Sequence, residues 1–209
     1  MAPVTRRESR KQDRRQAIVE AARASFLKNG YAGTSMSGLL KTLGGSKATL
    51  WGYFRSKEEL FAAVIEDVSL NFRAEIQDVL ATETDLERSI AAFCRAFLRK
   101  ITSPDGQATW RLVIAESGRF PEVGQIFHEK AASRVQGTLR EYLARQIAEG
   151  KLVQEDPAIM VETLISLCSG QHMRAIWGLE RLSDEELDIW AQRFTRHFLK
   201  VYSANGWSG

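Results

Sequence analysis

Apolar residues recur three or four positions apart along nearly the whole of this 209-residue chain, which is the spacing of one face of an α-helix. The clearest instance starts after Ser56, where Leu60, Val64 and Val68 follow one another, and it continues to about Leu80. No stretch alternates apolar and polar residues with the period of two that is typical of a half-buried strand. The chain contains only four Pro, so long helices meet few residues that would break them. The pattern therefore predicts an all-α fold.

Capping and turn residues divide this pattern into about nine predicted helices. Ser56 and Glu59 stand three apart, which is the spacing of a capping box at a helix N-terminus. Asn29-Gly30 and Gly44-Gly45 are suited to helix ends, because Gly readily adopts the left-handed conformation that often follows the last helical residue. The predicted helices cover approximately residues 14–28, 34–43, 46–53, 56–80, 86–101, 107–117, 121–149, 157–180 and 184–201.

Positive charge is concentrated in the first quarter of the chain. Residues 1–57 contain twelve Lys or Arg and three acidic residues, whereas the whole chain has a formal net charge of +3. The remaining residues therefore carry a net negative charge, and a polyanion is the expected partner of the first quarter alone. A basic segment that is merely solvated is the alternative interpretation.

Residues 34–53 have the pattern of a helix-turn-helix, because two short predicted helices are joined by a Gly-containing turn. In this motif the second helix enters the major groove of duplex DNA, with its N-terminal residues nearest to the bases. Leu39, Leu43 and Leu50 are the apolar residues expected to hold the two helices together. A helical hairpin inside a bundle is the alternative reading of the same spacing.

The side chains available for DNA differ in the contact that each is expected to make. Lys47 and Thr49 lie in the first turn of the predicted recognition helix, where small or basic side chains approach the base edges. Trp51 and Tyr53 offer ring faces and polar edges, and Lys57 stands at a helix start, a position that suits a phosphate. The residues expected to bind DNA are Thr34, Ser35, Ser46, Lys47, Thr49, Trp51, Tyr53 and Lys57.

The sequence from Arg14 to Ala63 resembles the DNA-binding domain of the TetR/AcrR family of bacterial regulators. The most specific similarity lies in residues 46–60, SKATLWGYFRSKEEL, where the family usually has Ser-Lys-x-Thr-Leu-Tyr-x-x-Phe-x-x-Lys-x-x-Leu. Residues 30–35, GYAGTS, are similar to the junction that follows the family's first helix. Further along, residues 110–122, WRLVIAESGRFPE, resemble a subgroup of TetR-like C-terminal domains.

The chain also departs from the family pattern within the helix-turn-helix. Leu40 and Leu43 stand where the family usually has Ala, and Gly45 stands where Val is frequent. Trp51 replaces a common Tyr, so an indole N–H takes the place of a hydroxyl that could meet a phosphate. The resemblance therefore implies the recognition mode but not the details of operator geometry.

The resemblance implies a domain organisation and a function. We expect a basic arm over residues 1–13, a DNA-binding domain over 14–60, and a helical effector-binding and dimerisation domain over 61–209. The implied function is that of a sequence-specific repressor, bound to double-stranded operator DNA and released from it by a small-molecule ligand. The implied homodimer pairs through the last two helices. The apolar stripe of Trp190, Phe194 and Phe198 agrees with such pairing, although packing against the chain's own core would explain it equally well.

The expected effector is small and apolar or aromatic, because large rings are dense in helices that DNA contact does not require. For each candidate residue, plain core packing is the alternative, and Glu116 also suits a helix cap or an exposed position. The residues expected to bind the effector are Phe93, Phe97, Trp110, Glu116, Phe127, Cys168 and His172.

Two other functional classes fit the sequence less well. The chain has no Gly-x-Ser-x-Gly elbow, phosphate-binding Gly-rich loop or His-Glu-x-x-His pattern, so we expect no enzymatic activity and no cofactor. The three His, at positions 128, 172 and 197, are too dispersed to predict a metal site. A protein that coats DNA without sequence preference is disfavoured by the net negative charge beyond residue 57, which would repel DNA.

The location of the protein is expected to be cytoplasmic. No apolar segment follows the basic start as a signal peptide would require, and none is long enough to span a membrane. Cys94 and Cys168 lie far apart in the sequence and in apolar surroundings, which predicts core or pocket-lining residues rather than a disulfide framework.

Overall fold

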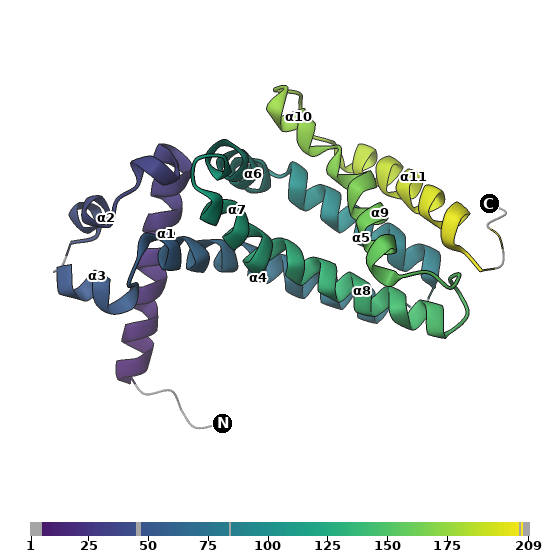
Figure 1. The fold of residues 1–209 in the computed structure, drawn as a ribbon, viewed down its shortest axis with the longest axis horizontal. Coiled ribbons are helices and arrows are strands. Elements are labelled where there is room, and N and C mark those ends of the chain that lie inside the picture. The colour runs from purple at the N-terminus through teal and green to yellow at the C-terminus, as the bar shows by residue number, and fades with distance from the viewer. Residues whose placement is uncertain (1–5, 45–46, 84, 205, 207–209) are drawn as a thin grey trace. The chain divides into compact units, whose positions relative to one another are not determined.

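The computed structural model describes residues 6–44, 47–83, 85–204 and 206, and these residues are almost entirely helical (Figure 1). This architecture confirms the all-α fold class. Within the described residues, an isolated antiparallel bridge also joins Leu152 to Ser203. The elements are α1 (Arg6–Gly33), α2 (Met36–Leu43), α3 (Lys47–Tyr53), α4 (Lys57–Thr82), α5 (Leu86–Thr102), α6 (Pro104–Ser117), α7 (Pro121–Phe127), the π-helix η1 (His128–Ala132), α8 (Ser133–Ala148), α9 (Pro157–Ser169), α10 (His172–Ile176) and α11 (Asp184–Tyr202).

Two of the predicted helices are subdivided in the structure. The helix predicted over 121–149 is one continuous run in which the π-helix η1 separates α7 from α8. The uninterrupted helix predicted over 157–180 is wrong, because the chain turns between α9 and α10 at Gly170 and Gln171. There the Gln171 N–H donates to the Cys168 carbonyl at 3.2 Å, a tighter turn than an α-helix makes, and Gly170 itself favours helix poorly. When these divisions are set aside, the described elements correspond to the nine predicted helices.

The first helix begins at Arg6 rather than near Arg14. Its additional turns consist of polar and charged residues, so no apolar periodicity marks them in the sequence. Gly30, predicted to end this helix, has φ 76° and ψ 173° and bends the chain, after which a further helical turn runs to Gly33.

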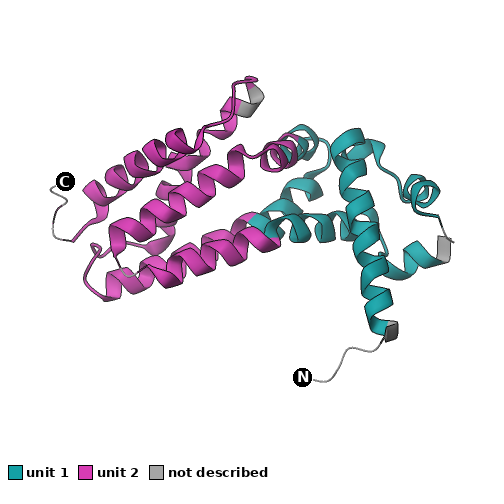
Figure 2. Cartoon of the chain, turned by 180° about the vertical axis from the view of Figure 1, so that it is seen from behind, with its two compact units in different colours: residues 1–69, 112–131 teal, residues 70–111, 132–209 magenta. Residues whose placement is uncertain are grey.

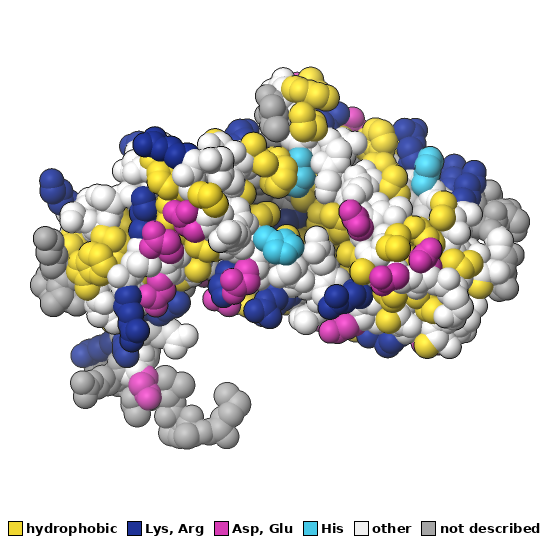
Figure 3. Space-filling view, in the orientation of Figure 1, with side chains coloured by type: hydrophobic (Ala, Val, Ile, Leu, Met, Phe, Trp, Pro, Cys, Tyr) yellow, Lys and Arg dark blue, Asp and Glu magenta, His cyan; other side chains and the backbone are white. Residues whose placement is uncertain are grey.

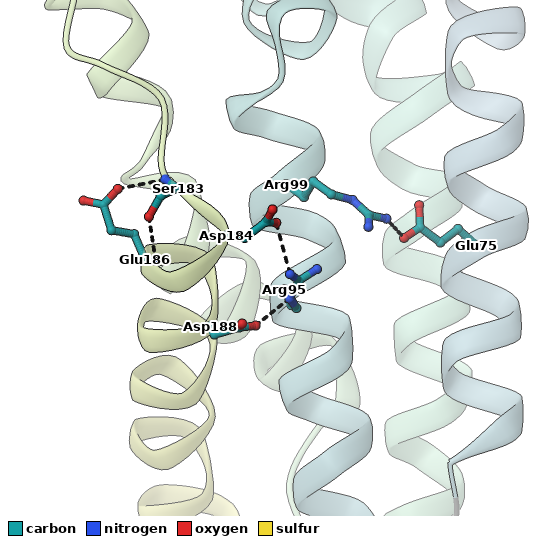
Figure 4. Close-up of polar contacts among 7 residues, drawn as sticks. All are labelled: Glu75, Arg95, Arg99, Ser183, Asp184, Glu186 and Asp188. Carbon is teal, nitrogen blue, oxygen red and sulfur yellow. Dashed lines mark hydrogen bonds and ion pairs between the residues drawn. The ribbon is translucent and has the colours of Figure 1, made fainter.

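Serine residues cap two helix N-termini, one predicted from the sequence at Ser56 and one at Ser183, in different ways. At the start of α11, the Ser183 hydroxyl accepts from the Glu186 N–H at 3.2 Å, and the Glu186 carboxylate accepts from the Ser183 N–H at 2.8 Å (Figure 4). This is the complete capping box. At the start of α4, the Ser56 hydroxyl accepts from the Glu59 N–H at 3.1 Å, but the Glu59 carboxylate accepts from the Arg55 N–H at 2.7 Å.

The chain packs into two compact units (Figure 2). Unit 1 comprises residues 1–69 and 112–131, and unit 2 comprises residues 70–111 and 132–209. Residues 112–131, which contain the C-terminal part of α6, all of α7 and most of η1, therefore pack with the N-terminal helices despite their distance in sequence. The functional domains expected from the sequence, with boundaries after residues 13 and 60, stay a prediction.

Aromatic rings form the centre of unit 1. Phe26 packs on Tyr31 and Phe61 with ring centroids 5.7 and 5.1 Å apart, and Tyr31 and Phe61 are 5.2 Å apart. Val113 and Val123 are buried in the same core. Burial of each such ring contributes about 1.5–3 kcal/mol to folding, so this cluster stabilises the unit that carries the helix-turn-helix.

In unit 2 the core lies where α5 packs against α9 and α11. Phe198 is completely buried and Phe194 is 8% exposed, whereas Trp190 is half-buried. The stripe of three rings on α11 therefore packs largely against its own chain, as the alternative reading held.

Ion pairs tie α5 to its neighbours on the surface of unit 2 (Figure 4). Arg95 donates to Asp184 and Asp188 of α11, and Arg99 donates to Glu75 of α4. The hydrogen bond with Asp188 is the main cause of the raised pKa of Arg95. Because these side chains are partly exposed, each pair contributes less than about 1 kcal/mol, and the buried apolar core determines the packing.

Candidate nucleic-acid interface

Helices α2 and α3 form the predicted helix-turn-helix in unit 1 (Figure 1). Leu39 of α2 and Leu50 of α3 are 4% and 1% exposed, and Leu43 packs against the same core, as predicted. Gly44 ends α2 with φ 62°, and its N–H donates to the Leu40 carbonyl at 3.0 Å. The two helices are therefore held by the leucines that the sequence analysis singled out.

The outward face of α3 carries the residues best placed for DNA. Thr49 is exposed, and Trp51 is 45% exposed, which is unusual for so large an apolar side chain in a unit of this size. Gly52 is also exposed, and a Cβ built on it would have no atom within 4 Å. Ser46 lies outside the described residues, and of Lys47 only the backbone, at the start of α3, is described.

Thr34 and Ser35 are engaged within the protein. Thr34 is 2% exposed; its hydroxyl donates to the Gly30 carbonyl at 2.9 Å and lies 3.0 Å from the Ser25 hydroxyl. Ser35 is exposed and caps α2, accepting from the Gly38 N–H at 3.0 Å. Thr34 therefore orders the junction between α1 and α2 and offers little surface to DNA, whereas the Ser35 hydroxyl proton remains available to a phosphate.

Lys57, predicted to bind a phosphate, also has partners inside unit 1. Its ammonium donates to the Tyr31 carbonyl at 2.9 Å and lies 4.1 Å from the centre of the Tyr31 ring. The Tyr31 hydroxyl donates to Glu58 at 3.3 Å, and burial, followed by this carboxylate, raises the pKa of Tyr31. Lys57 thus joins the start of α4 to the end of α1, and a phosphate contact would have to use its remaining donors.

Basic residues of α1 that the sequence analysis did not single out lie beside the helix-turn-helix. Arg14 donates to the carbonyls of Leu43 at 3.3 Å and Gly44 at 2.7 Å, and so holds the C-terminal end of α2. An open hollow of about 430 Å³ is lined by Glu8, Lys11, Gln12, Arg15, Gln16 and Tyr53. Figure 3 shows Lys and Arg side chains along this N-terminal half of α1. Only the local excess of positive charge could have indicated them.

The seven residues expected to bind an effector fall into two groups. Glu116 and Phe127 belong to unit 1, where Glu116 accepts from backbone N–H groups at the end of α1. The other five belong to unit 2 and are Phe93, Phe97, Trp110, Cys168 and His172. The structure therefore does not gather all seven within one compact unit.

Within unit 2, Trp110 and His172 form a stacked pair with ring centroids 4.3 Å apart and an interplanar angle of 19°. The Nδ1 atom of His172 is buried without a hydrogen-bond partner among the described residues. Burial lowers the pKa of His172 to about 4, so its imidazole is neutral at neutral pH. A buried polar atom without a partner is uncommon in a protein core and suits a ligand or water that completes its hydrogen bonding.

The remaining candidates of unit 2 are core residues. Phe93 is completely buried and stacks on Phe97 at 5.9 Å, and Phe97 also contacts Phe72 at 6.2 Å. Cys168 is completely buried, and its pKa is raised, first by a hydrogen bond with the Cys94 thiol and then by burial. The two cysteines are reduced and are core residues, as predicted, and the fold brings them together.

The part of the chain that the structure describes contains neither a metal-binding cluster nor a membrane-spanning helix. No three His, Cys, Asp or Glu side chains there could hold a metal ion together. None of the described helices combines the length and apolar character needed to cross a membrane.

Comparison with known proteins assigns both parts of the chain. Residues 18–64 match the family of bacterial regulatory proteins called the tetR family, and residues 88–204 match the family described as AefR-like transcriptional repressor, C-terminal domain. This chain belongs to the TetR family. It is a DNA-binding transcriptional repressor with an AefR-like C-terminal domain. Regulators of this family are not enzymes, so the assignment decides against the enzyme class.

Two curated proteins align over most of this chain. The HTH-type transcriptional repressor ComR of Escherichia coli K12 is 25% identical over 187 residues, which are 85% of this chain and 89% of ComR. The nucleoid occlusion factor SlmA of Haemophilus influenzae PittGG is 24% identical over 179 residues, covering 84% of this chain and 81% of SlmA.

Two solved structures have the same fold as this chain. A regulator from Mesorhizobium loti superposes with a TM-score of 0.80 at 26% identity, covering 93% of this chain and 98% of the other. The flavonoid-responsive regulator FrrA superposes with a TM-score of 0.81 at 28% identity, covering 92% of this chain and 98% of FrrA.

Proposed function

We propose that this TetR-family repressor binds a near-palindromic operator as a homodimer and that a planar aromatic ligand releases it. The exposed face of α3, with Thr49, Trp51 and Gly52, is the observation that supports direct reading of DNA. In a helix-turn-helix dimer each recognition helix reads one half-site, so the two-fold symmetry of the protein is mirrored in the DNA.

Exposed apolar side chains on α9 and α11 support the proposed dimer. Ile159 of α9 is 48% exposed, and Ile189 and Val201 of α11 are 49% and 65% exposed. These are the two helices that the TetR resemblance assigns to pairing, and burying such side chains between copies would stabilise the assembly. Light scattering at micromolar concentration tests this proposal, and a monomer would contradict it.

The stacked pair of Trp110 and His172 supports a planar aromatic effector that carries a hydroxyl or carbonyl group. A ring can stack with these two side chains, and its polar group can hydrogen-bond to the Nδ1 atom of His172. FrrA, by its name a flavonoid-responsive regulator, is a structural relative of suitable chemistry. Because the imidazole is neutral at neutral pH, a neutral phenol matches it better than an anion does.

Two measurements test the proposed function. Replacement of Thr49 by Ala should cost about 1–3 kcal/mol of operator binding and relax the preference at one base pair, whereas binding to random duplex should change little. Unchanged affinity and preference would contradict the assignment of α3 as the recognition helix. For the effector, a panel of planar phenols is screened for release of operator DNA. Calorimetric titration then compares the affinity of a releasing phenol with and without operator, and equal affinities would rule out allosteric release.

A further inference from the structure

A carboxylate from a distant part of the sequence holds the end of α1. After the break at Gly30, the following N–H groups begin a new helical turn and need acceptors. The Oε1 atom of Glu116, in α6, accepts from the Tyr31 N–H at 2.9 Å and from the Ala32 N–H at 3.4 Å. A carboxylate is favoured at this position because the first N–H groups of a helical turn carry partial positive charge.

The approach of Glu116 depends on Gly30 in two ways. A Cβ atom at Gly30 would lie 2.4 Å from Glu116 Oε1, so any side chain there would displace the carboxylate. The φ of 76° is also a conformation that residues other than Gly rarely adopt. Phe120, from the segment that follows α6, packs on the Tyr31 ring at 5.3 Å. The segment 112–131 therefore contacts both the backbone N–H groups of Tyr31 and Ala32 and the Tyr31 ring.

The residues fixed by Glu116 lead directly into the helix-turn-helix. Two residues beyond Ala32, the Thr34 hydroxyl bonds back to the Gly30 carbonyl, and Ser35 then provides the N-cap of α2. Because α2 and α3 pack together in one core, a shift of this junction would move the exposed face of α3. The contact of Glu116 is thus linked to the recognition helix through a short, hydrogen-bonded stretch of chain.

We propose that Glu116 is a positioning residue for operator binding. Its carboxylate fixes the α1–α2 junction in the arrangement that presents α3 to DNA, although Glu116 itself does not contact DNA. Helix α6 runs from Pro104 to Ser117, so the same helix carries Trp110 of the proposed effector site and Glu116. The inference rests on the proposed function, because it assumes that α3 reads an operator.

The test compares operator and scrambled DNA for variants of one residue. A duplex selected by the wild-type protein from a random library serves as operator. Replacement of Glu116 by Ala should weaken operator binding about tenfold or more, since two hydrogen bonds to a charged acceptor are lost. Glu116→Gln should stay within about threefold of wild type, because the amide oxygen can still accept both bonds. Glu141, exposed on α8, gives the matched control: Glu141→Ala makes the same change in charge and should leave the preference for operator unaltered.

Hydrogen exchange distinguishes positioning from general destabilisation. The amides of Tyr31 and Ala32 should exchange faster in Glu116→Ala and at the wild-type rate in Glu116→Gln, whereas core amides of unit 2 should be unaffected. Gly30→Ala should weaken operator binding in the wild-type background and less so in the Glu116→Ala background, because the clash with the carboxylate is then absent.

Each outcome decides between the alternatives. Enrichment of no duplex in the selection would refute the proposed function. If a duplex is enriched and Glu116→Ala still prefers it as wild type does, only the inference about Glu116 fails. Equal losses for operator and scrambled DNA, or a Gln variant as weak as the Ala variant, would also overturn it. Should Glu116→Ala not fold, Glu116→Asp takes its place, because its shorter side chain cannot reach both N–H groups; Asp and Gln variants of equal operator affinity would then refute the inference.

Discussion

Gly52 offers a prediction in which stability and DNA binding should change in opposite directions. Gly52 lies inside α3, where the Phe54 N–H continues the helical pattern by donating to the Leu50 carbonyl at 3.0 Å. A Cβ there would meet no atom of the protein, and φ is not positive, so Ala fits without strain. Gly52→Ala should therefore raise the free energy of unfolding by about 0.5–1 kcal/mol, which corresponds to roughly 1–4 °C in Tm for a chain of this length.

The same methyl group should weaken operator binding. Thr49 and Gly52 are three positions apart and exposed, so they lie on neighbouring parts of the face assigned to DNA. If that face is in close contact with DNA, an added methyl group costs on the order of 1–3 kcal/mol, which corresponds to roughly 5- to 150-fold in affinity. Gly137→Ala on α8 is the control, because its Cβ also has no atom within 4 Å and its helix is remote in sequence from the motif.

Thermal unfolding and fluorescence-anisotropy titration of labelled operator measure the two effects. Gly137→Ala should gain similar stability and bind operator as wild type does. Operator binding of Gly52→Ala at full wild-type affinity, together with raised Tm, would refute the reasoning that α3 approaches DNA by this face. An equal loss of affinity in both variants would show that the effect does not depend on contact with DNA.

Three further predictions follow from side chains engaged within each unit. Lys57→Ala removes the ammonium that bonds to the Tyr31 carbonyl and should lower the free energy of unfolding, measured in urea, by about 1.5–3 kcal/mol. The salt dependence of operator binding then shows whether the same ammonium also contacts a phosphate, since one phosphate contact contributes about one unit to the slope of log affinity against log salt concentration. Burial lowers the pKa of His172 from 6.5 to about 4, so between these pH values the unfolded chain binds a proton that the folded chain excludes. The free energy of unfolding should therefore fall by up to about 2 kcal/mol from pH 7 to pH 5. Chemical denaturation at the two pH values measures this fall, and His172→Phe should remove it. Cys94 and Cys168 are buried, and the pKa of Cys168 is raised, so both thiols should react with a thiol reagent only after denaturant unfolds unit 2; rapid reaction of the native protein would contradict this packing.

Helix positions and the helix-turn-helix could be predicted because their signals are local. Leu39 and Leu50 follow the apolar spacing, and Ser183 with Glu186 forms a cap within a single turn of helix. The N-terminal turns of α1 lack such a signal, since residues 6–13 are polar and no apolar face marks them. The break at Gly170 likewise has no clear signal in the sequence, because apolar residues continue on both sides of it.

The roles of polar residues are less predictable, because the sequence does not show whether a polar side chain binds DNA or a backbone group far away in the chain. Lys57 has the position and charge expected of a phosphate ligand, yet its ammonium bonds to a carbonyl 26 residues earlier in the chain. Thr34 is predicted to bind DNA, whereas the structure buries it. Glu116 was considered for the effector site, but it bonds to an N–H group 85 residues away, and such a contact has no signature in the local sequence.

The inclusion of residues 112–131 in unit 1 bears on how DNA specificity could be exchanged between regulators of this type. A hybrid joined at residue 60 would pair the N-terminal helices of one parent with Glu116, Phe120 and Val123 of another. Recombination at that point therefore separates the N-terminal helices from the segment 112–131 that packs against them. A graft that also carries residues 112–131 keeps the matched set together, so the transferable module of this repressor is discontinuous in the gene.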